Sequence, residues 1–155
     1  LYFTGAPNDQ QYIDRKQGLE DALKGSNITI LGEYNVENAK DLGMSTADDC
    51  LLSYDSFDAI VCQNDDAALG VVEALKSAGK QDSIQVLGVD GSDDALESIK
   101  NGEMTMTSLQ DAKAQAEAGA QIFEDLKNGT DPADIEDVSI PFKIVTAENV
   151  DEYLK

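Results

Sequence analysis

The stretch Asp58-Ala-Ile-Val-Cys-Gln-Asn-Asp-Asp-Ala-Ala-Leu-Gly70 joins a short apolar run to a helical pattern through polar residues. Residues 59–62 are continuously apolar, which is typical of a strand that is covered on both faces. Beyond the polar residues, apolar side chains recur at helical spacing until Gly79, at Ala68, Leu69, Val72 and Leu75. The stretch therefore predicts a strand, a polar turn and a helix, in that order.

The same alternation continues in both directions along the chain. We expect strands at residues 1–4, 28–31, 59–62, 84–89, 104–109 and 142–145, and helices at residues 9–24, 37–52, 65–78, 92–100 and 111–128. This order predicts an α/β fold with a doubly wound, mainly parallel sheet and helices on both faces. In such sheets ligands bind beyond the carboxyl ends of the strands, although the fold alone does not define a function.

The charge balance excludes several classes of partner. The 155 residues include 31 Asp and Glu against 11 Lys and Arg, for a net charge of −20, and contain no His. A field of that sign repels phosphate backbones, so we expect no nucleic-acid partner. Without His the commonest metal ligand and general base are missing. We therefore expect no metal, no cofactor and no enzymatic activity.

The two cysteines, Cys50 and Cys62, are too few for a disulfide framework. Cys62 lies within an apolar run, and the chain has no His that could activate it as a nucleophile. We expect Cys62 to be a buried free thiol that acts as a small apolar side chain.

Amides and carboxylates follow each of the expected parallel strands. The residues at these strand ends are Asn8, Asp9, Asn35, Asn38, Gln63, Asn64, Asp65, Asp90, Gln110 and Asp111, together with Tyr34 and Gly91. They contain no nucleophile–base pair, no Gly-rich phosphate loop and no set of ligands with metal spacing. A carboxylate accepts hydrogen bonds from hydroxyls, and an Asn or Gln both donates and accepts. The strand ends therefore favour recognition of a hydroxyl-rich molecule.

Some of these polar residues have a second interpretation. Asp, Asn and Ser after a strand are also common helix N-caps, and Asp65 and Ser92 are interpreted in that way. Asn64 and Asp90 each precede the expected cap, and both capping and ligand binding remain open for them. Arg15, in the first helix, either extends to solvent or turns back toward the sheet edge.

Several segments, in the same order and spacing, resemble the second lobe of the type I periplasmic solute-binding proteins, which take up ribose, xylose, galactose and related sugars. The segments are residues 15–18 with 22–23, 58–79, 86–91, 99–103 and 107–111, and together they extend over nearly the whole chain. The effector domains of lac-repressor-type regulators share this lobe pattern. A regulator domain and the receptor domain of a membrane sensor therefore remain alternatives.

The resemblance implies a protein of two similar α/β lobes, of which this chain is a truncated second lobe. Residues 1–109 would form the ligand-binding lobe, with a returning strand at about 140–147. Residues 110–139 would form a helix and an acidic loop that pack on the missing first lobe, and residues 148–155 a C-terminal tail. The chain opens inside an expected strand and without an initiator Met, so we expect residues upstream to be missing.

The resemblance also implies a set of ligand-binding residues. These are Arg15, Asn64, Asp90 and Gln110, together with Asn38 and Asn8. Arg15 would donate to ring or hydroxyl oxygens, Asp90 would accept from two hydroxyls, and Asn64 and Gln110 would add amide hydrogen bonds. Tyr34 is the one nearby aromatic candidate for stacking on a sugar, and no metal site is carried over.

The function that the resemblance implies is solute binding for an ABC-type sugar uptake system. The ligand would be a carbohydrate, in particular a monosaccharide, held between two lobes. The full-length protein would be bound by a membrane permease. The location would be extracytoplasmic, in the periplasm or lipid-anchored at the cell surface. In this chain the surface that faces the missing lobe would be exposed, which favours a homodimer of the fragment.

Overall fold

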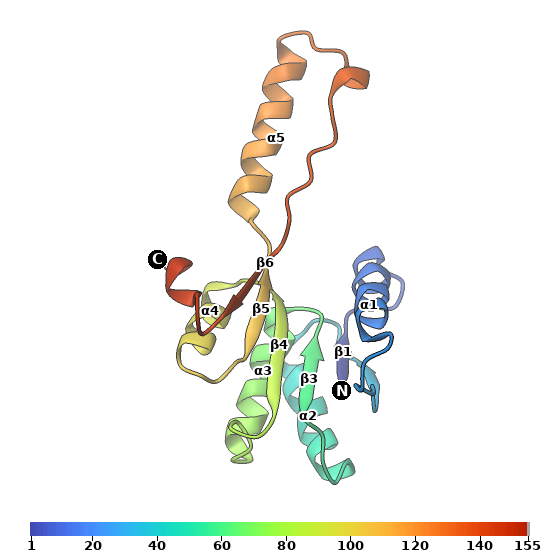
Figure 1. The fold of residues 1–155 in the computed structure, drawn as a ribbon, viewed down its shortest axis with the longest axis vertical. Coiled ribbons are helices and arrows are strands. Elements are labelled where there is room, and N and C mark those ends of the chain that lie inside the picture. The colour runs from blue at the N-terminus through green and yellow to red at the C-terminus, as the bar shows by residue number, and fades with distance from the viewer. Residues whose placement is uncertain (155) are drawn as a thin grey trace.

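A computed structural model describes residues 1–154 as a six-stranded sheet with flanking helices and a projecting arm (Figure 1). The elements are β1 (Tyr2–Thr4), α1 (Gln10–Leu23), β2 (Glu33–Asn35), α2 (Lys40–Ser53), β3 (Ala59–Cys62), α3 (Asp65–Ser77), β4 (Gln85–Asp90), α4 (Asp93–Lys100), β5 (Met106–Leu109), α5 (Ala112–Lys127), η1 (Pro132–Asp134), β6 (Lys143–Thr146) and η2 (Val150–Glu152). The strand order is β2-β1-β3-β4-β5-β6, and only the β5–β6 pair is antiparallel. The predicted doubly wound, mainly parallel α/β fold is confirmed.

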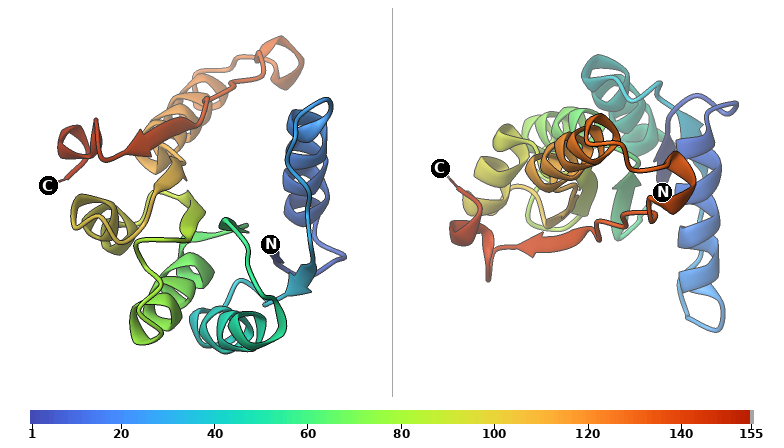
Figure 2. Two further views of the ribbon diagram at one scale, coloured as in Figure 1. Left: turned by 60° about the horizontal axis from the view of Figure 1, so that its bottom comes forward. Right: turned by 90° about the horizontal axis from the view of Figure 1, so that it is seen from above.

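The two faces of the sheet are covered to different extents. Helices α2 and α3 lie along one face, and α1 lies on the other side (Figure 2). Side chains on the α3 side are buried completely, as at Ile60 and Val86, both 0% exposed. Their neighbours Val61 and Leu87 point to the opposite face and are only partly buried. Side chains of the apolar runs in β3 and β4 therefore alternate between a fully covered face and a half-covered face of the sheet.

Two glycines allow α2 and α3 to cross closely. Gly43 lowers the helix propensity of α2, but a Cβ at this position would lie 2.5 Å from the carbonyl oxygen of Ala67. A Cβ at Gly70 would lie 2.0 Å from the carbonyl oxygen of Lys40. Both positions are therefore explained by backbone contact between the two helices, which a larger residue would prevent.

The second strand lies later in the chain than its hydrophobic pattern predicts. The expected strand at 28–31 is wrong, because these residues are not paired and Ile28 is 67% exposed. Instead Glu33–Asn35 pairs with β1, starting with Tyr2 opposite Glu33. β2 is an edge strand, so its position is set by main-chain pairing with β1 and not by burial of its own side chains.

Two other elements begin later than expected. Helix α2 starts at Lys40 and not near Glu37, because Glu37 and Asn38 have φ angles of 51° and 57°. Residues in this left-handed region cannot continue into a right-handed helix. The strand expected from Met104 starts at Met106, since the N–H of Met104 bonds a carbonyl at the end of α4.

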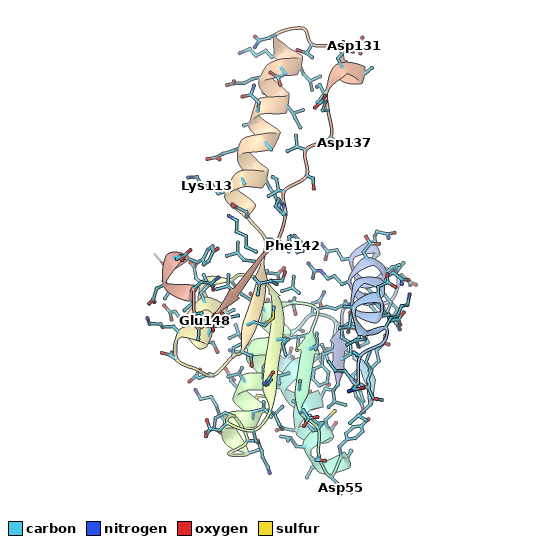
Figure 3. All side chains as sticks on the ribbon, in the orientation of Figure 1. Asp55, Lys113, Asp131, Asp137, Phe142 and Glu148 are labelled. Carbon is cyan, nitrogen blue, oxygen red and sulfur yellow. The ribbon has the colours of Figure 1, made fainter. Side chains whose placement is uncertain are left out.

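Helix α5 and the segment that follows it form an arm, which we define as residues 112–142. Figure 3 shows the arm standing away from the sheet, with Lys113 near its base, Asp131 at its tip and Phe142 where it returns. No residue of α5 is buried, and Phe123 is 68% exposed. The chain then re-enters the sheet as β6. That the arm packs on a first lobe remains a prediction.

The C-terminal residues, expected to be a tail, include a packed turn. Val150 in η2 is 1% exposed and belongs to the hydrophobic core. Lys100 of α4 forms an ion pair with Asp151. This turn therefore contributes to the lobe.

Candidate functional site

Three of the predicted site residues meet at the carboxyl edge of the sheet. Asp90 is the last residue of β4, and Gln110 directly follows β5. The side-chain Nε2 of Gln110 donates to Oδ1 of Asp90 over 2.5 Å. Nη2 of Arg15, from α1, lies 3.6 Å from the same oxygen. The fold thus places a carboxylate between a guanidinium and an amide.

Of the two alternatives predicted for Arg15, extension to solvent or a turn toward the sheet edge, the structure shows the second. Nη1 of Arg15 donates to the backbone carbonyl of Gln63, at the end of β3. The side chain is 17% exposed, whereas that of Asp90 is 38% exposed. The guanidinium is therefore held at the edge of the sheet by two partners, and the Asp90 carboxylate remains accessible to solutes.

Asp90 has an unusual backbone conformation. Its φ is 132°, and the next residue, Gly91, has a φ of 78°. A non-glycine residue in this region is strained by about 1–3 kcal/mol, and such strain is concentrated at functional sites. A Cβ at Gly91 would also lie 2.5 Å from Cγ of Leu109. The turn after β4 thus requires glycine at position 91 and constrains the direction of the Asp90 side chain.

Asn64 acts as a helix cap and also contacts a second predicted residue. Its Oδ1 accepts the N–H of Ala67 over 3.0 Å, which caps α3. Its Nδ2 donates to the carbonyl oxygen of Asn38 over 2.9 Å and carries a second hydrogen. Asn38 is thereby connected to the carboxyl edge, next to the β1–α1 loop.

The side chain of Asn38 packs against the start of that loop. A Cβ at Gly5 would lie 2.5 Å from Nδ2 of Asn38, so a larger residue at position 5 would displace the Asn38 side chain. Oδ1 of Asn38 is buried and has no hydrogen-bond partner among residues 1–154. Asn8, in contrast, is exposed before α1 and is hydrogen-bonded to none of the other candidates. Five of the six candidates thus make side-chain or backbone contacts at this edge, and Asn8 lies in the β1–α1 loop that leaves the same edge without a hydrogen bond to them.

Gln63, a strand-end residue that was not among the predicted ligand residues, also contributes to this edge. It is 3% exposed, and its Oε1 accepts the N–H of Gly5 over 3.0 Å. Its Nε2 donates to the hydroxyl of Tyr2 over 2.5 Å and to the carbonyl oxygen of Tyr12 over 3.2 Å. Gln63 therefore joins β1, its loop and α1. Its place directly after a buried strand was the available signal.

Asp65 does not cap α3, so the capping interpretation is wrong for this residue. The carboxylate is 1% exposed and accepts hydrogen bonds from the N–H groups of Gly91 and Ser92, both at 2.8 Å, and from the Thr107 hydroxyl at 2.7 Å. Burial raises the pKa of Asp65, and these three donors partly offset that effect. The capping interpretation is confirmed for Ser92, whose Oγ accepts the N–H of Ala95 over 3.3 Å.

Tyr34 does not reach the polar cluster. Its hydroxyl lies 2.7 Å from that of Tyr54, which follows α2. Its ring meets Phe3 edge-on, with the ring centroids 5.8 Å apart. The aromatic candidate therefore packs with the core, and the candidate site on this lobe is formed by polar side chains.

Residues 1–154 show neither a metal site nor a membrane-spanning helix, and a further hollow lies at the opposite edge of the sheet. In that range no three His, Cys, Asp or Glu side chains are arranged to hold a metal ion. No helix in the same range is long and apolar enough to cross a membrane. A hollow of about 470 Å³ lies at the amino edge of the sheet, beside Phe57 and Gln85. It is open and lined by both apolar and polar side chains.

The sequence matches a family model, described as a periplasmic binding protein domain, over residues 1–131. A protein of Rhizobium meliloti named for rhizopine binding is 33% identical over 134 residues, which are 86% of this chain and 42% of that protein. The xylitol-binding protein of Mycolicibacterium smegmatis is 30% identical over 145 residues, 90% of this chain and 40% of its own length. The chain thus spans less than half the length of these curated relatives.

Solved structures of solute-binding proteins also resemble this chain, again over about half of their own length. An ABC transporter solute-binding protein from Bacillus halodurans with bound myo-inositol superposes with a TM-score of 0.90 and 32% identity, over 98% of this chain and 52% of that one. The myo-inositol-binding protein of Caulobacter gives a TM-score of 0.87 and 28% identity, over 97% and 52% of the two chains. The chain belongs to the periplasmic binding protein family.

Proposed function

We propose that this chain is a ligand-binding lobe of a solute-binding protein that serves an ABC-type sugar uptake system. The observation that carries the proposal is the cluster of Arg15 and Gln110 around the Asp90 carboxylate. Adjacent hydroxyls of a polyol need an acceptor and neighbouring donors, which these three side chains supply together. The ligand class is therefore a monosaccharide or a related polyol.

The accessible part of Asp90 favours binding over a purely structural ion pair. Its Oδ1 is engaged by Arg15 and Gln110, whereas no donor among residues 1–154 bonds Oδ2. A partly exposed carboxylate oxygen beside fixed donors can accept a ligand hydroxyl without breaking the existing contacts. The free N–H of Asn64 would add a further donor close by.

The arm supports a two-lobed arrangement. It rises from the same edge of the sheet as the cluster, because Gln110 lies two residues before α5 (Figure 1). Apolar side chains are exposed along it, including Phe123 at 68% and Phe142 at 48%. A first lobe that packs on this surface would lie over Asp90 and enclose the ligand on hinge closure. Without that lobe, the same surface would favour a homodimer of this chain.

The remaining steps of the proposal concern the whole protein. Closure around the ligand would be recognised by a membrane permease, and no bond of the ligand would be made or broken. The location would be extracytoplasmic, as in the periplasmic family to which the chain belongs. One lobe supplies only part of the contacts, so the affinity of this chain alone should be no tighter than about 1 mM, or about −4 kcal/mol.

Isothermal titration calorimetry tests the proposal. The longest polypeptide that carries this chain is titrated with D-ribose, D-allose, xylitol and myo-inositol, beside the chain alone. We expect micromolar binding of at least one of these by the two-lobed protein and weak binding by the single lobe. Absence of heat with all four, in a protein shown to be folded by circular dichroism, would contradict a simple sugar or polyol ligand.

A further inference from the structure

Asp65 is a buried carboxylate whose hydrogen-bond donors all lie outside its own helix. Capping of α3 is performed by Asn64, so the start of that helix does not require the Asp65 side chain. The donors are the N–H groups of Gly91 and Ser92 and the hydroxyl of Thr107. A carboxylate that is 1% exposed must have such donors, because a buried charge without them is costly.

Two of these donors belong to the residues that directly follow Asp90. Asp90 has a φ of 132°, which the chain does not maintain without support from its surroundings. The adjacent N–H groups of Gly91 and Ser92 both point to Oδ2 of Asp65, at 2.8 Å. Hydrogen bonds to a charged acceptor are roughly twice as strong as those between neutral groups. Asp65 therefore holds the turn in which the strained residue lies.

The third donor connects the same carboxylate to the neighbouring strand. The Thr107 hydroxyl donates to Oδ1 of Asp65 over 2.7 Å and also accepts the N–H of Gly91 over 3.2 Å. Three residues beyond Thr107 is Gln110, whose backbone N–H donates to the carbonyl oxygen of Asp90 over 2.9 Å. The carboxylate thus bonds both the turn after β4 and strand β5, next to the backbone bond that joins Gln110 to Asp90.

The space for this carboxylate depends on Gly88. A Cβ at that position would lie 2.4 Å from Oδ1 of Asp65. Glycine in the middle of β4 weakens a strand, and here its absence of a side chain leaves room for the buried carboxylate.

We propose that Asp65 is a positioning residue for the ligand site: it holds the Asp90-Gly91-Ser92 turn so that the Asp90 carboxylate faces Arg15 and Gln110. The consequence for ligand binding rests on the proposed function. The role of Asp65 in holding the turn does not depend on the proposed function, because it concerns only contacts within this chain. The inference can therefore be tested with one measurement that needs no ligand and one that does.

The first measurement is amide hydrogen exchange by NMR on the wild-type chain and three variants. In Asp65→Ala the amides of Gly91 and Ser92 should exchange about tenfold faster or more, since each loses a hydrogen bond to a charged group. In Asp65→Asn the exchange should be intermediate, because one amide oxygen can still accept both N–H groups. Asp66→Ala is the matched control, since Asp66 is exposed on the same helix turn, and should leave both amides unchanged.

Unchanged exchange at Gly91 and Ser92 in a folded Asp65→Ala protein would overturn the proposal. An equal increase in the exchange rates of the β3 amides and of Gly91 and Ser92 would also overturn it, because this would indicate general destabilisation of the lobe. If Asp65→Ala does not fold, Thr107→Val replaces it, since this change removes the hydroxyl that bonds both Asp65 and Gly91. The Ser92 amide, which bonds Asp65 and not Thr107, should then lose protection because Asp65 has lost one of its three donors. Unchanged protection of Ser92 would again contradict the role.

The second measurement is a double-mutant cycle on affinity for whichever of the four polyols the wild type binds. If Asp65 acts through Asp90, Asp65→Ala should weaken binding about tenfold in the wild-type background, because Asp90 loses its fixed orientation. It should weaken binding less than about twofold in the Asp90→Ala background, because coupled sites are not additive. Equal losses in both backgrounds would overturn the proposal. Absence of any polyol binding would remove the proposed function, and the exchange measurement would still decide whether Asp65 holds the turn.

Discussion

The Nε2 group of Gln110 donates to Oδ1 of Asp90 over 2.5 Å, across a separation of 20 residues in the chain. Asp90 ends β4, and Gln110 connects β5 to the arm that begins at Ala112. The residue that forms the centre of the polar cluster is thus bonded to the base of the arm. A change in the direction of the arm should therefore be transmitted to the Asp90 side chain.

Removal of the Asp90 charge should weaken ligand binding. In Asp90→Asn the shape is kept, but the hydrogen bonds to a charged acceptor are lost, which are worth about 1.5–3 kcal/mol each. We expect the affinity for the bound polyol to fall roughly 10- to 100-fold by calorimetry. Asp94→Asn is the matched control, because Asp94 is exposed on α4, and should retain wild-type affinity. Wild-type affinity in Asp90→Asn would show that the ligand does not contact this carboxylate.

The close crossing of α2 and α3 should depend on Gly70. In Gly70→Ala the new Cβ would lie 2.0 Å from the carbonyl oxygen of Lys40, so the helices must separate. We expect a loss of about 1–3 kcal/mol in the free energy of unfolding, measured by urea denaturation. Gly119→Ala in α5 has no atom within 4 Å and should stabilise its helix by up to about 1 kcal/mol. Equal changes in the free energy of unfolding for Gly70→Ala and Gly119→Ala would contradict this explanation of the helix crossing.

Much of the fold and of the site could be predicted from the sequence, because the apolar and polar pattern of single segments also determines where the parallel strands place their ends. The apolar runs of β3 and β4 end in polar residues, and parallel strands bring such ends together. Asp90 and Gln110 were expected at one edge for that reason, whereas the position of Arg15 was left open by the helical pattern and implied only by the family resemblance. The structure places the three side chains together.

The errors arose where the local pattern carried too little information. An apolar run at 28–31 resembles a strand, but edge pairing selects Glu33–Asn35 through main-chain hydrogen bonds that no side-chain pattern reveals. Capping of α3 was assigned to Asp65 and left open for Asn64, because two adjacent polar residues offer the same capping chemistry, and the structure assigns the cap to Asn64. Only the three-dimensional position of the β4 turn separates them.

The arm should be dispensable for the stability of the lobe. Replacement of residues 112–141 by a short Gly- and Asn-rich turn joins β5 directly to β6, which already pair with Leu109 opposite Lys143. Because no α5 residue is buried, we expect the free energy of unfolding to change by less than about 1 kcal/mol. Val150→Ala, at a core position, should instead cost about 1–3 kcal/mol. Unfolding of the armless lobe would contradict this division of the chain.

Both thiols should be unreactive in the native protein. Burial raises the pKa of the Cys50 and Cys62 thiols, so the reactive thiolate forms only at a higher pH than in an exposed cysteine. We expect slow labelling by a disulfide reagent at pH 8, a faster rate as the pH rises, and rapid labelling of both residues in denaturant. Fast labelling of either residue at pH 8 without denaturant would contradict their burial in the core.

The central claim is the location of the ligand at the carboxyl edge of the sheet, and an NMR titration of this chain with myo-inositol up to millimolar concentrations tests it most directly. We predict that chemical shifts change at the Arg15 guanidinium, at the side-chain amides of Asn64 and Gln110, and at the backbone of Asp90. Changes confined to the hollow beside Phe57 and Gln85, at the opposite edge, would contradict the claim.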